Sequence, residues 1–286
     1  MKCRVILAYR CAMSIRRGCA LLGLSRSAFY AWCQRPPSPR ARTNGQLVQA
    51  MRRIHVEVDR CYGSPRMRDE LRAQGFSCGA NRVARLMHAH GIRAKQARRF
   101  RPTTDSQHPH PVAPNVLDRQ FRVAAPNRVW ASDVTYVWTR EGWLYLAVVL
   151  DLFSRRVVGW HLAPRLTRPL VLTALQRALA GRQPAPGLLH HSDRGSQYAS
   201  GDYQRVLRHH GARCSMSRKG DCWDNAVVES FFHSLKIERI RHRHYRTRDH
   251  AHKDVHDYIE RFYNRMRRHS TLDNISPVMY ELKHAA

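Results

Sequence analysis

The chain has 286 residues and a formal net charge of +29, with 50 Lys and Arg against 21 Asp and Glu. This length suffices for one sizeable hydrophobic core and a smaller accessory domain. Residues 1–101 alone hold 22 Lys and Arg against 4 Asp and Glu, interleaved with helical apolar patterns. Because Lys and Arg neutralise phosphates, this balance favours a nucleic-acid partner over a merely basic structural surface.

Two further classes of protein are disfavoured. The eight cysteines contain no C-x-x-C pair and no histidine pair at metal spacing accompanies them, which argues against a zinc site and is typical of a reducing cytoplasm. The longest apolar stretch, Trp143 to Leu150, is far too short to span a bilayer, so no membrane partner is expected.

The first hundred residues read as all-helical, and residues 1–35 form a first helix-turn-helix candidate. A short helix over 16–22 is followed by a turn at Gly23 and a second helix with Ser25 as its N-cap. A helix that enters a DNA groove needs polar and basic side chains near its N-terminus. This one offers Arg26, Ser27 and Tyr30. A helical hairpin without a DNA role is the alternative interpretation.

A second DNA-binding unit of the same kind is predicted over 43–95. Its expected helices cover 43–60, 64–75 and 81–91. Ser64 is the expected N-cap of the middle helix, with Pro65 at the first helical position. Arg82 and Arg85 are exposed candidates for DNA contact on the last helix. A basic linker without periodicity, over 96–123, follows.

Residues 124–240 change to an α/β pattern with a mixed sheet. Strands are expected at 129–138, 143–153, 155–162, 187–192 and, more loosely, 213–219. Helices are expected at 167–180 and 201–211, followed by a helix that carries Glu229. A helical extension over 241–286 closes the chain. It is expected to be helical to about Arg268 and to end in Ser276-Pro277.

Three acidic residues stand in very different surroundings within this region. Asp133 interrupts a strand-like run, Asp193 closes a short apolar run, and Glu229 lies in a helical pattern with 35 residues between it and Asp193. A carboxylate beside apolar strands costs free energy unless something compensates, and a divalent cation is the usual compensation. Two cations roughly 4 Å apart can serve the attacking and leaving oxygens of phosphoryl transfer. The pattern predicts such a site.

The helix around Glu229 has two different faces. Asn225, Glu229, His233 and Lys236 fall on one face, whereas the apolar residues of this segment fall on the other, core-facing side. Lys236 is thereby placed to meet a phosphate.

Other acids compete for the catalytic role. Structural roles are favoured for Asp151, as a turn cap, and for Asp221 and Asp224, as loop and N-cap residues.

Several long motifs resemble one known family. Residues 130–136, 191–198 and 224–232 are similar to segments of the transposases of the IS-three insertion-sequence family, and the match extends to 151–160 and 263–272. The order and length of these motifs make the resemblance specific. It implies an RNase H-like, integrase-type catalytic domain with a mixed five-stranded sheet and a D,D-35-E triad, preceded by the all-α helix-turn-helix region.

The resemblance also implies a mechanism. Asp133, Asp193 and Glu229 would hold two Mg²⁺ ions, for which Mn²⁺ substitutes, and would support donor-strand nicking by water and then attack of the freed 3′-OH on another strand. It suggests DNA contacts for Lys236, Asn225, Arg194, His191, Arg218 and Lys219. A non-catalytic helix-turn-helix regulator and an RNase H-like nuclease are the alternative functions.

The same resemblance implies partners. These are double-stranded DNA, both the terminal inverted repeats of the element and the target, and further copies of the chain, since joining two ends needs at least two active sites. The chain begins at Met1 as a downstream reading frame would, so an upstream-frame protein or a fusion with it is a further expected partner. The expected location is the bacterial cytoplasm, in association with the nucleoid.

Overall fold

The computed structural model describes residues 2–95, 112–218 and 222–284. The chain divides into two compact units, Met1–Met51 and Arg52–Ala286. Most of the expected linker over 96–123 lies outside the described residues. In the described ranges no helix combines the length and the apolar character needed to cross a membrane.

The first unit is helical, as expected. It contains α1 (Lys2–Ala8), α2 (Ile15–Leu21), α3 (Arg26–Gln34) and the start of α4 (Pro39–Glu57). Ser25 caps α3 by accepting a 3.1 Å hydrogen bond from the Ala28 backbone N–H, which confirms the predicted cap. Gly23 has a φ of +58°, so the turn between α2 and α3 uses a left-handed conformation that favours glycine. Ile6, Cys19 and Phe29 form the core of this unit.

Two shorter helices begin the second unit, α5 (Ser64–Ala73) and α6 (Ala80–Ala89). The expected cap at Ser64 is wrong by one residue, because Gly63 is the N-cap and makes no side-chain capping bond. Pro65 fits either start, since the first turn of a helix has N–H groups without intrahelical partners. The apolar face of α6 is buried through Val83, Leu86 and Met87.

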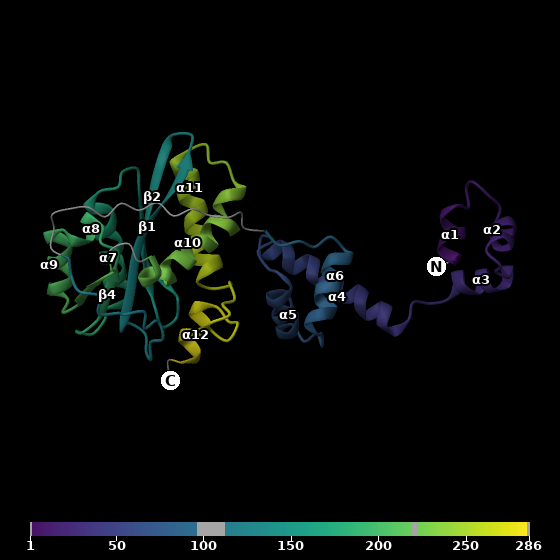
Figure 1. The fold of residues 1–286 in the computed structure, drawn as a ribbon, viewed down its shortest axis with the longest axis horizontal. Coiled ribbons are helices and arrows are strands. Elements are labelled where there is room, and N and C mark those ends of the chain that lie inside the picture. Colours follow the sequence, from purple (N-terminus) through teal and green to yellow (C-terminus); the bar gives the residue numbers. More distant parts are fainter. Residues whose placement is uncertain (1, 96–111, 219–221, 285–286) are drawn as a thin grey trace. The chain divides into compact units, whose positions relative to one another are not determined.

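A five-stranded mixed sheet forms the centre of the second unit (Figure 1), which confirms the predicted fold class. Its strands are β1 (Val129–Thr139), β2 (Gly142–Asp151), β3 (Val157–Ala163), β4 (Leu189–Ser192) and β5 (Arg213–Met216). The order is β3-β2-β1-β4-β5, with antiparallel pairing among the first three strands and parallel pairing of β1 with β4 and of β4 with β5.

Helices lie on both sides of this sheet (Figure 1). On one side are α7 (Arg168–Arg182), the short α8 (Ser196–Ala199), which was not expected, and α9 (Gly201–His209). Gly159 of β3 permits the close approach of α7, because a Cβ atom there would lie 2.4 Å from the Ala174 carbonyl oxygen. The main core lies between α7 and the sheet and includes Trp130 and Val149.

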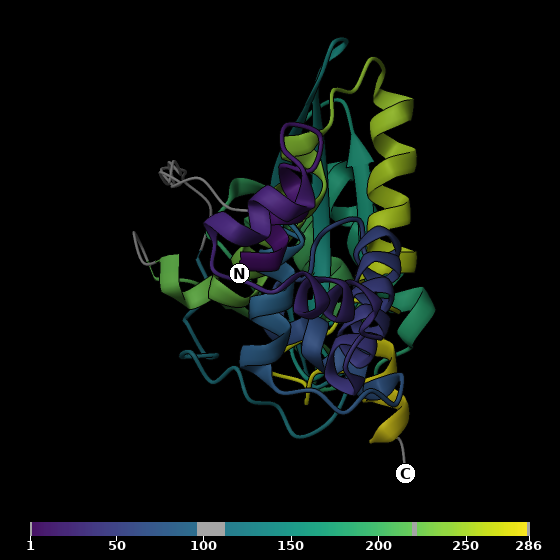
Figure 2. The same cartoon turned by 90° about the vertical axis from the view of Figure 1, so that its right-hand side faces the viewer.

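The other side of the sheet carries the helix with Glu229 and the C-terminal region. A 3₁₀ turn, η1 (Cys222–Asn225), leads into α10 (Ala226–Glu238), and η2 (Ile240–His242) follows it. Then α11 (Arg248–His256) continues into a π-helical segment, η3 (Asp257–Tyr263), and Figure 2 shows this rod alongside the sheet.

A last helix, α12 (Pro277–Lys283), was not expected. The Ser276-Pro277 pair, expected to end the helical C-terminal region, instead starts this helix: Ser276 accepts a hydrogen bond from the Met279 N–H, and Pro277 occupies the first turn.

Candidate active site

The structure brings Asp133, in the middle of β1, next to Asp193, the residue that follows β4. Ser132 of β1 and Ser192 of β4 are direct partners in the parallel ladder, so the two aspartates are the next residues along neighbouring strands. Neighbouring strands lie about 4.8 Å apart. The Val134 N–H donates to Asp133 Oδ1 at 2.7 Å, and the Gly195 N–H donates to Asp193 Oδ1 at 2.9 Å. Each carboxylate is therefore held by the backbone that follows it.

Glu229 enters the same electrostatic neighbourhood from α10. Burial raises the pKa of Asp133 well above its usual value, and the charges of Asp193 and Glu229 raise it further. Partial burial also raises the pKa of Glu229. The apolar face of α10 is buried as predicted, through Val228, Phe231, Phe232 and Leu235, whereas Glu229 is exposed. Thus the charges of both Asp193 and Glu229 act on Asp133.

Asn225 connects the start of α10 to β1. Its amide Nδ2 donates to the backbone carbonyl of Ser132 at 3.2 Å, one residue before Asp133. Its Oδ1 is buried and has no hydrogen-bond partner in the part of the chain that is described. The predicted DNA contact at Asn225 is therefore not supported by its position, because the side chain is buried and tied to the strand.

Two buried histidines lie behind the aspartates. His190 Nε2 contacts Ser132 Oγ at 2.9 Å and the Tyr203 hydroxyl at 3.0 Å, and His191 contacts the hydroxyls of Ser215 and Ser217. Burial lowers the pKa of His190 to about 3 and that of His191 to about 4. Both rings are consequently neutral near pH 7 and cannot offset the carboxylates. The expectation that His191 contacts DNA needs correction, because its side chain is wholly enclosed.

Lys236 lies on the same face of α10 as Glu229. Its ammonium group is 4.9 Å from the centre of the Tyr136 ring. Burial lowers the pKa of Lys236, as does the charge of Arg241, while the charge of Asp133 opposes the shift. The charge of Lys236 therefore interacts with that of Asp133.

The competing acids have structural partners. Asp151 is buried and accepts hydrogen bonds from the backbone N–H groups of Asn127 and Phe153, which confirms its role at a turn. The expected N-cap role of Asp224 is wrong: it is buried and bonds Arg218 and Arg119, whose side chains hold its pKa well below the usual value. Asp221 lies outside the described residues.

The remaining predicted DNA contacts have varied positions. Arg194 donates to the Ser217 carbonyl oxygen at 2.6 Å, Arg218 is half exposed and bonded to Asp224, and Lys219 lies outside the described residues. In the helical regions, exposed side chains belong to Arg26, Ser27, Tyr30 and Arg85, while Arg82 is half buried. Their contacts with DNA stay predictions.

One neighbour of the acids was missed at the level of sequence. Tyr198 is buried, its hydroxyl has no hydrogen-bond partner among the described residues, and burial together with nearby Tyr203 and both aspartates raises its pKa well above the usual value. Tyr198 lies in α8, which has only four residues, so no apolar periodicity in the sequence indicated that its side chain is buried.

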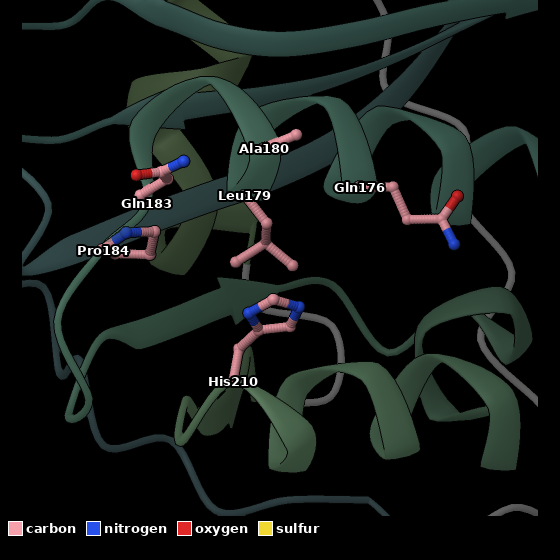
Figure 3. Close-up of a pocket in the computed structure, with 6 residues that line it drawn as sticks. All are labelled: Gln176, Leu179, Ala180, Gln183, Pro184 and His210. Carbon is pink, nitrogen blue, oxygen red and sulfur yellow. The ribbon is translucent and has the colours of Figure 1, made fainter.

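The acids lie apart from the hollow that Figure 3 shows. There, Leu179 of α7 and His210 point toward each other, and none of the predicted site residues is in the lining. In the described ranges, no three His, Cys, Asp or Glu side chains are gathered closely enough to form a finished metal cage. The two aspartates accept hydrogen bonds from backbone N–H groups, whereas Glu229 is exposed on α10.

Sequence comparison adds the family. The model of an integrase core domain matches residues 123–222, a second integrase core model matches 229–284, and an HTH-like domain matches 43–100. The transposase InsF for insertion sequence IS3A of Escherichia coli (strain K12) is 44% identical over 288 residues, covering 100% of both chains. The chain belongs to the IS3 (IS-three) family of transposases.

Other similar proteins include an uncharacterized 31 kDa protein of insertion element IS600 from Shigella sonnei, which is 45% identical to this chain over 266 residues, covering 93% of this chain and 98% of that relative. The HTLV-2 integrase catalytic core domain in complex with magnesium aligns with a TM-score of 0.41 and 15% identity, over 56% of this chain and 99% of that one. The transposase relatives do not favour the alternatives of a non-catalytic regulator or a simple nuclease.

Proposed function

We propose that this transposase cleaves the donor strand of an insertion sequence and joins it to a second strand, with Asp133, Asp193 and Glu229 as the catalytic acids. The observation that carries the proposal is that Asp133 and Asp193 directly follow Ser132 and Ser192, the last paired residues of the β1–β4 ladder, and that the charge of Glu229 acts on Asp133. The charges of Asp193 and Glu229 both act on the buried Asp133, where negative charge is costly unless a cation is bound.

The donor set fits a divalent cation. Carboxylate oxygens are the ligands that Mg²⁺ and Mn²⁺ prefer, and no softer ligand is needed. The charge of the three acids is not offset by His190 or His191, since both are neutral near pH 7. When bound between these acids, one or two such cations would supply electrostatic stabilisation to the attacking and leaving oxygens of a phosphodiester.

The chain's own residues orient the DNA around this centre. Asn225 ties the start of α10 to the strand that carries Asp133. This contact would hold Glu229 in a fixed position relative to Asp133. Lys236, two turns further along α10, can bind a phosphate beside the one that reacts. The hydrogen bonds of His190 with Ser132 and Tyr203 link β1, β4 and α9 beside the aspartates.

The partners follow from the same proposal. The helix-turn-helix regions would bind double-stranded DNA at the terminal inverted repeats, through residues such as Arg26 and Arg85, and the target would enter at the acids. Two ends joined together need two active sites, so we propose an oligomer of this chain assembled on DNA. An upstream-frame protein, or a fusion with it, would supply further recognition of the ends.

Product analysis tests the proposal. Labelled element ends are incubated with target DNA and Mg²⁺ or Mn²⁺, using wild type and Asp193→Asn. Cleaved and joined strands from wild type alone are expected. Cleavage without joining would instead indicate a nuclease. Binding that ignores Mg²⁺ and gives identical DNA products with both proteins would indicate a regulator.

A further inference from the structure

Three large aromatic side chains are exposed on the hairpin formed by β1 and β2. Tyr136 is 47% exposed, Trp138 is 58% exposed and Trp143 is 43% exposed. Their chain neighbours Val137 and Thr139 are buried on the opposite face of β1. Further along the same face, Ala147 is covered by the α7 core, so the hairpin end is the part of this face that α7 leaves uncovered.

The three rings form one cluster, which we call the aromatic platform. Trp138 and Trp143 are direct cross-strand partners with ring centres 4.8 Å apart at 71°, and Tyr136 meets Trp143 at 4.9 Å and 82°. Edge-to-face contacts of this kind hold aromatic rings in fixed mutual orientations. The platform is therefore preorganised, and its outer surface can receive another flat group.

The platform adjoins the candidate active site. Tyr136 is three residues beyond Asp133 on β1, about 10 Å along the strand, so alternation points the two side chains to opposite faces of the sheet, and Lys236 is the group that connects them. The ammonium group of Lys236 lies 4.9 Å from the Tyr136 ring centre and is also coupled to Asp133. A chain of adjacent groups thus runs from the acids, through a cation, to exposed aromatic faces. This arrangement is complementary to a nucleotide, with the cation facing its phosphate and an aromatic ring facing its base.

We propose that Tyr136, Trp138 and Trp143 stack against unpaired nucleobases at the DNA end that the acids process. The inference rests on the proposed function, because it needs a DNA end at Asp133. Every base has a π face, and stacking on aromatic side chains is the usual way in which proteins hold single strands without reading sequence. Lys236 would hold the phosphate next to the stacked base.

The size of the platform favours bases over a second protein copy. Aromatic side chains bury about 150–250 Å² each, so three that are about half exposed offer on the order of 300 Å². A stable protein interface needs roughly 800 Å² on each partner. One or two stacked bases, in contrast, fit an area of this order.

The test uses Asp193→Asn protein, so that DNA remains intact during binding. Duplex ends carry two mismatched terminal bases, one of them 2-aminopurine, and fully paired ends serve as the comparison. We expect the 2-aminopurine fluorescence to change on binding. Trp138→Ala should weaken binding to the mismatched end about tenfold, or about 1.4 kcal/mol, and leave binding to the paired end unchanged. Trp138→Phe should restore most of the affinity.

Leu166→Ala is the matched control, since Leu166 is an exposed apolar residue outside the platform, and it should bind both ends like the parent protein. Unchanged fluorescence on a bound mismatched end, or equal loss of affinity for both ends in Trp138→Ala, would overturn the proposal. So would a change in the oligomeric state of free Trp138→Ala protein without any effect on the bases, which would assign the platform to a second copy.

Failure of the proposed function has a different signature. In that case Asp193→Asn protein would still cleave and join paired ends at the wild-type rate, whatever the 2-aminopurine reports. The stacking measurement is made at equilibrium without any chemical step, so the two results are read independently.

Discussion

Replacing Gly159 by alanine perturbs the contact between α7 and the sheet that supports the candidate active site. The added Cβ atom would lie 2.4 Å from the Ala174 carbonyl oxygen, 2.6 Å from Ala178 Cβ and 2.8 Å from the Ala178 nitrogen. Both alanines are buried in the core, so neither backbone nor methyl group can move aside. Overpacking costs about 1–3 kcal/mol, and contacts with backbone put this case at about 2–3 kcal/mol.

The free energy of unfolding, measured by urea denaturation, provides the assay, and the same change should lower the melting temperature by about 5–10 °C. Gly181→Ala in α7 is the matched control. No atom lies within 4 Å of a Cβ at that position, and alanine should stabilise the helix by about 0.5–1 kcal/mol. If Gly159→Ala unfolded at the same urea concentration as wild type, the tight packing of α7 on β3 would be refuted.

Two other changes test the electrostatics. Because the pKa of Asp133 in the folded protein is raised, metal-free protein loses stability as the pH rises above the usual Asp pKa of 3.8. Asp133→Asn should therefore melt at a higher temperature than wild type at pH 7 in EDTA, and at the same temperature in acid. A lower melting temperature of Asp133→Asn at pH 7 would contradict this. Asp224→Ala should cost about 1–2 kcal/mol, since its arginine partners are half exposed, whereas Glu57→Ala, at an exposed pair with Arg53 in α4, should cost under about 0.5 kcal/mol. Equal losses in urea denaturation would contradict the assigned role of Asp224.

Patterns that depend on neighbouring residues in the chain were predictable. The strands of the sheet were expected because β1 and β2 are long apolar or alternating runs joined by a short turn. The faces of α10 followed from helical periodicity, and burial of Phe231 and exposure of Glu229 confirm it. Convergence of Asp133 and Asp193 required only that the end of β4 lie beside the middle of β1 as a parallel neighbour.

Features fixed by distant residues were not predictable. Asp224 looked like an N-cap, but Arg119, more than 100 residues earlier in the chain, and Arg218 bind it instead. His191 looked accessible beside Asp193, yet hydroxyl groups of the segment at and just after β5 bond both of its ring nitrogens. Helix α12 was missed because Ser276-Pro277 can either end one segment or begin another, and only tertiary packing decides.

The most direct test of the account compares strand transfer by wild type, Glu229→Gln and Asp202→Asn, with labelled element ends, target DNA and Mg²⁺. Asp202 is a half-exposed acid of α9, so its change to the amide controls for the loss of one charge. The account predicts joined product from wild type and Asp202→Asn, and none from Glu229→Gln, with end binding retained by all three. Joining by Glu229→Gln at the wild-type rate would contradict the assignment of Glu229 as a catalytic residue.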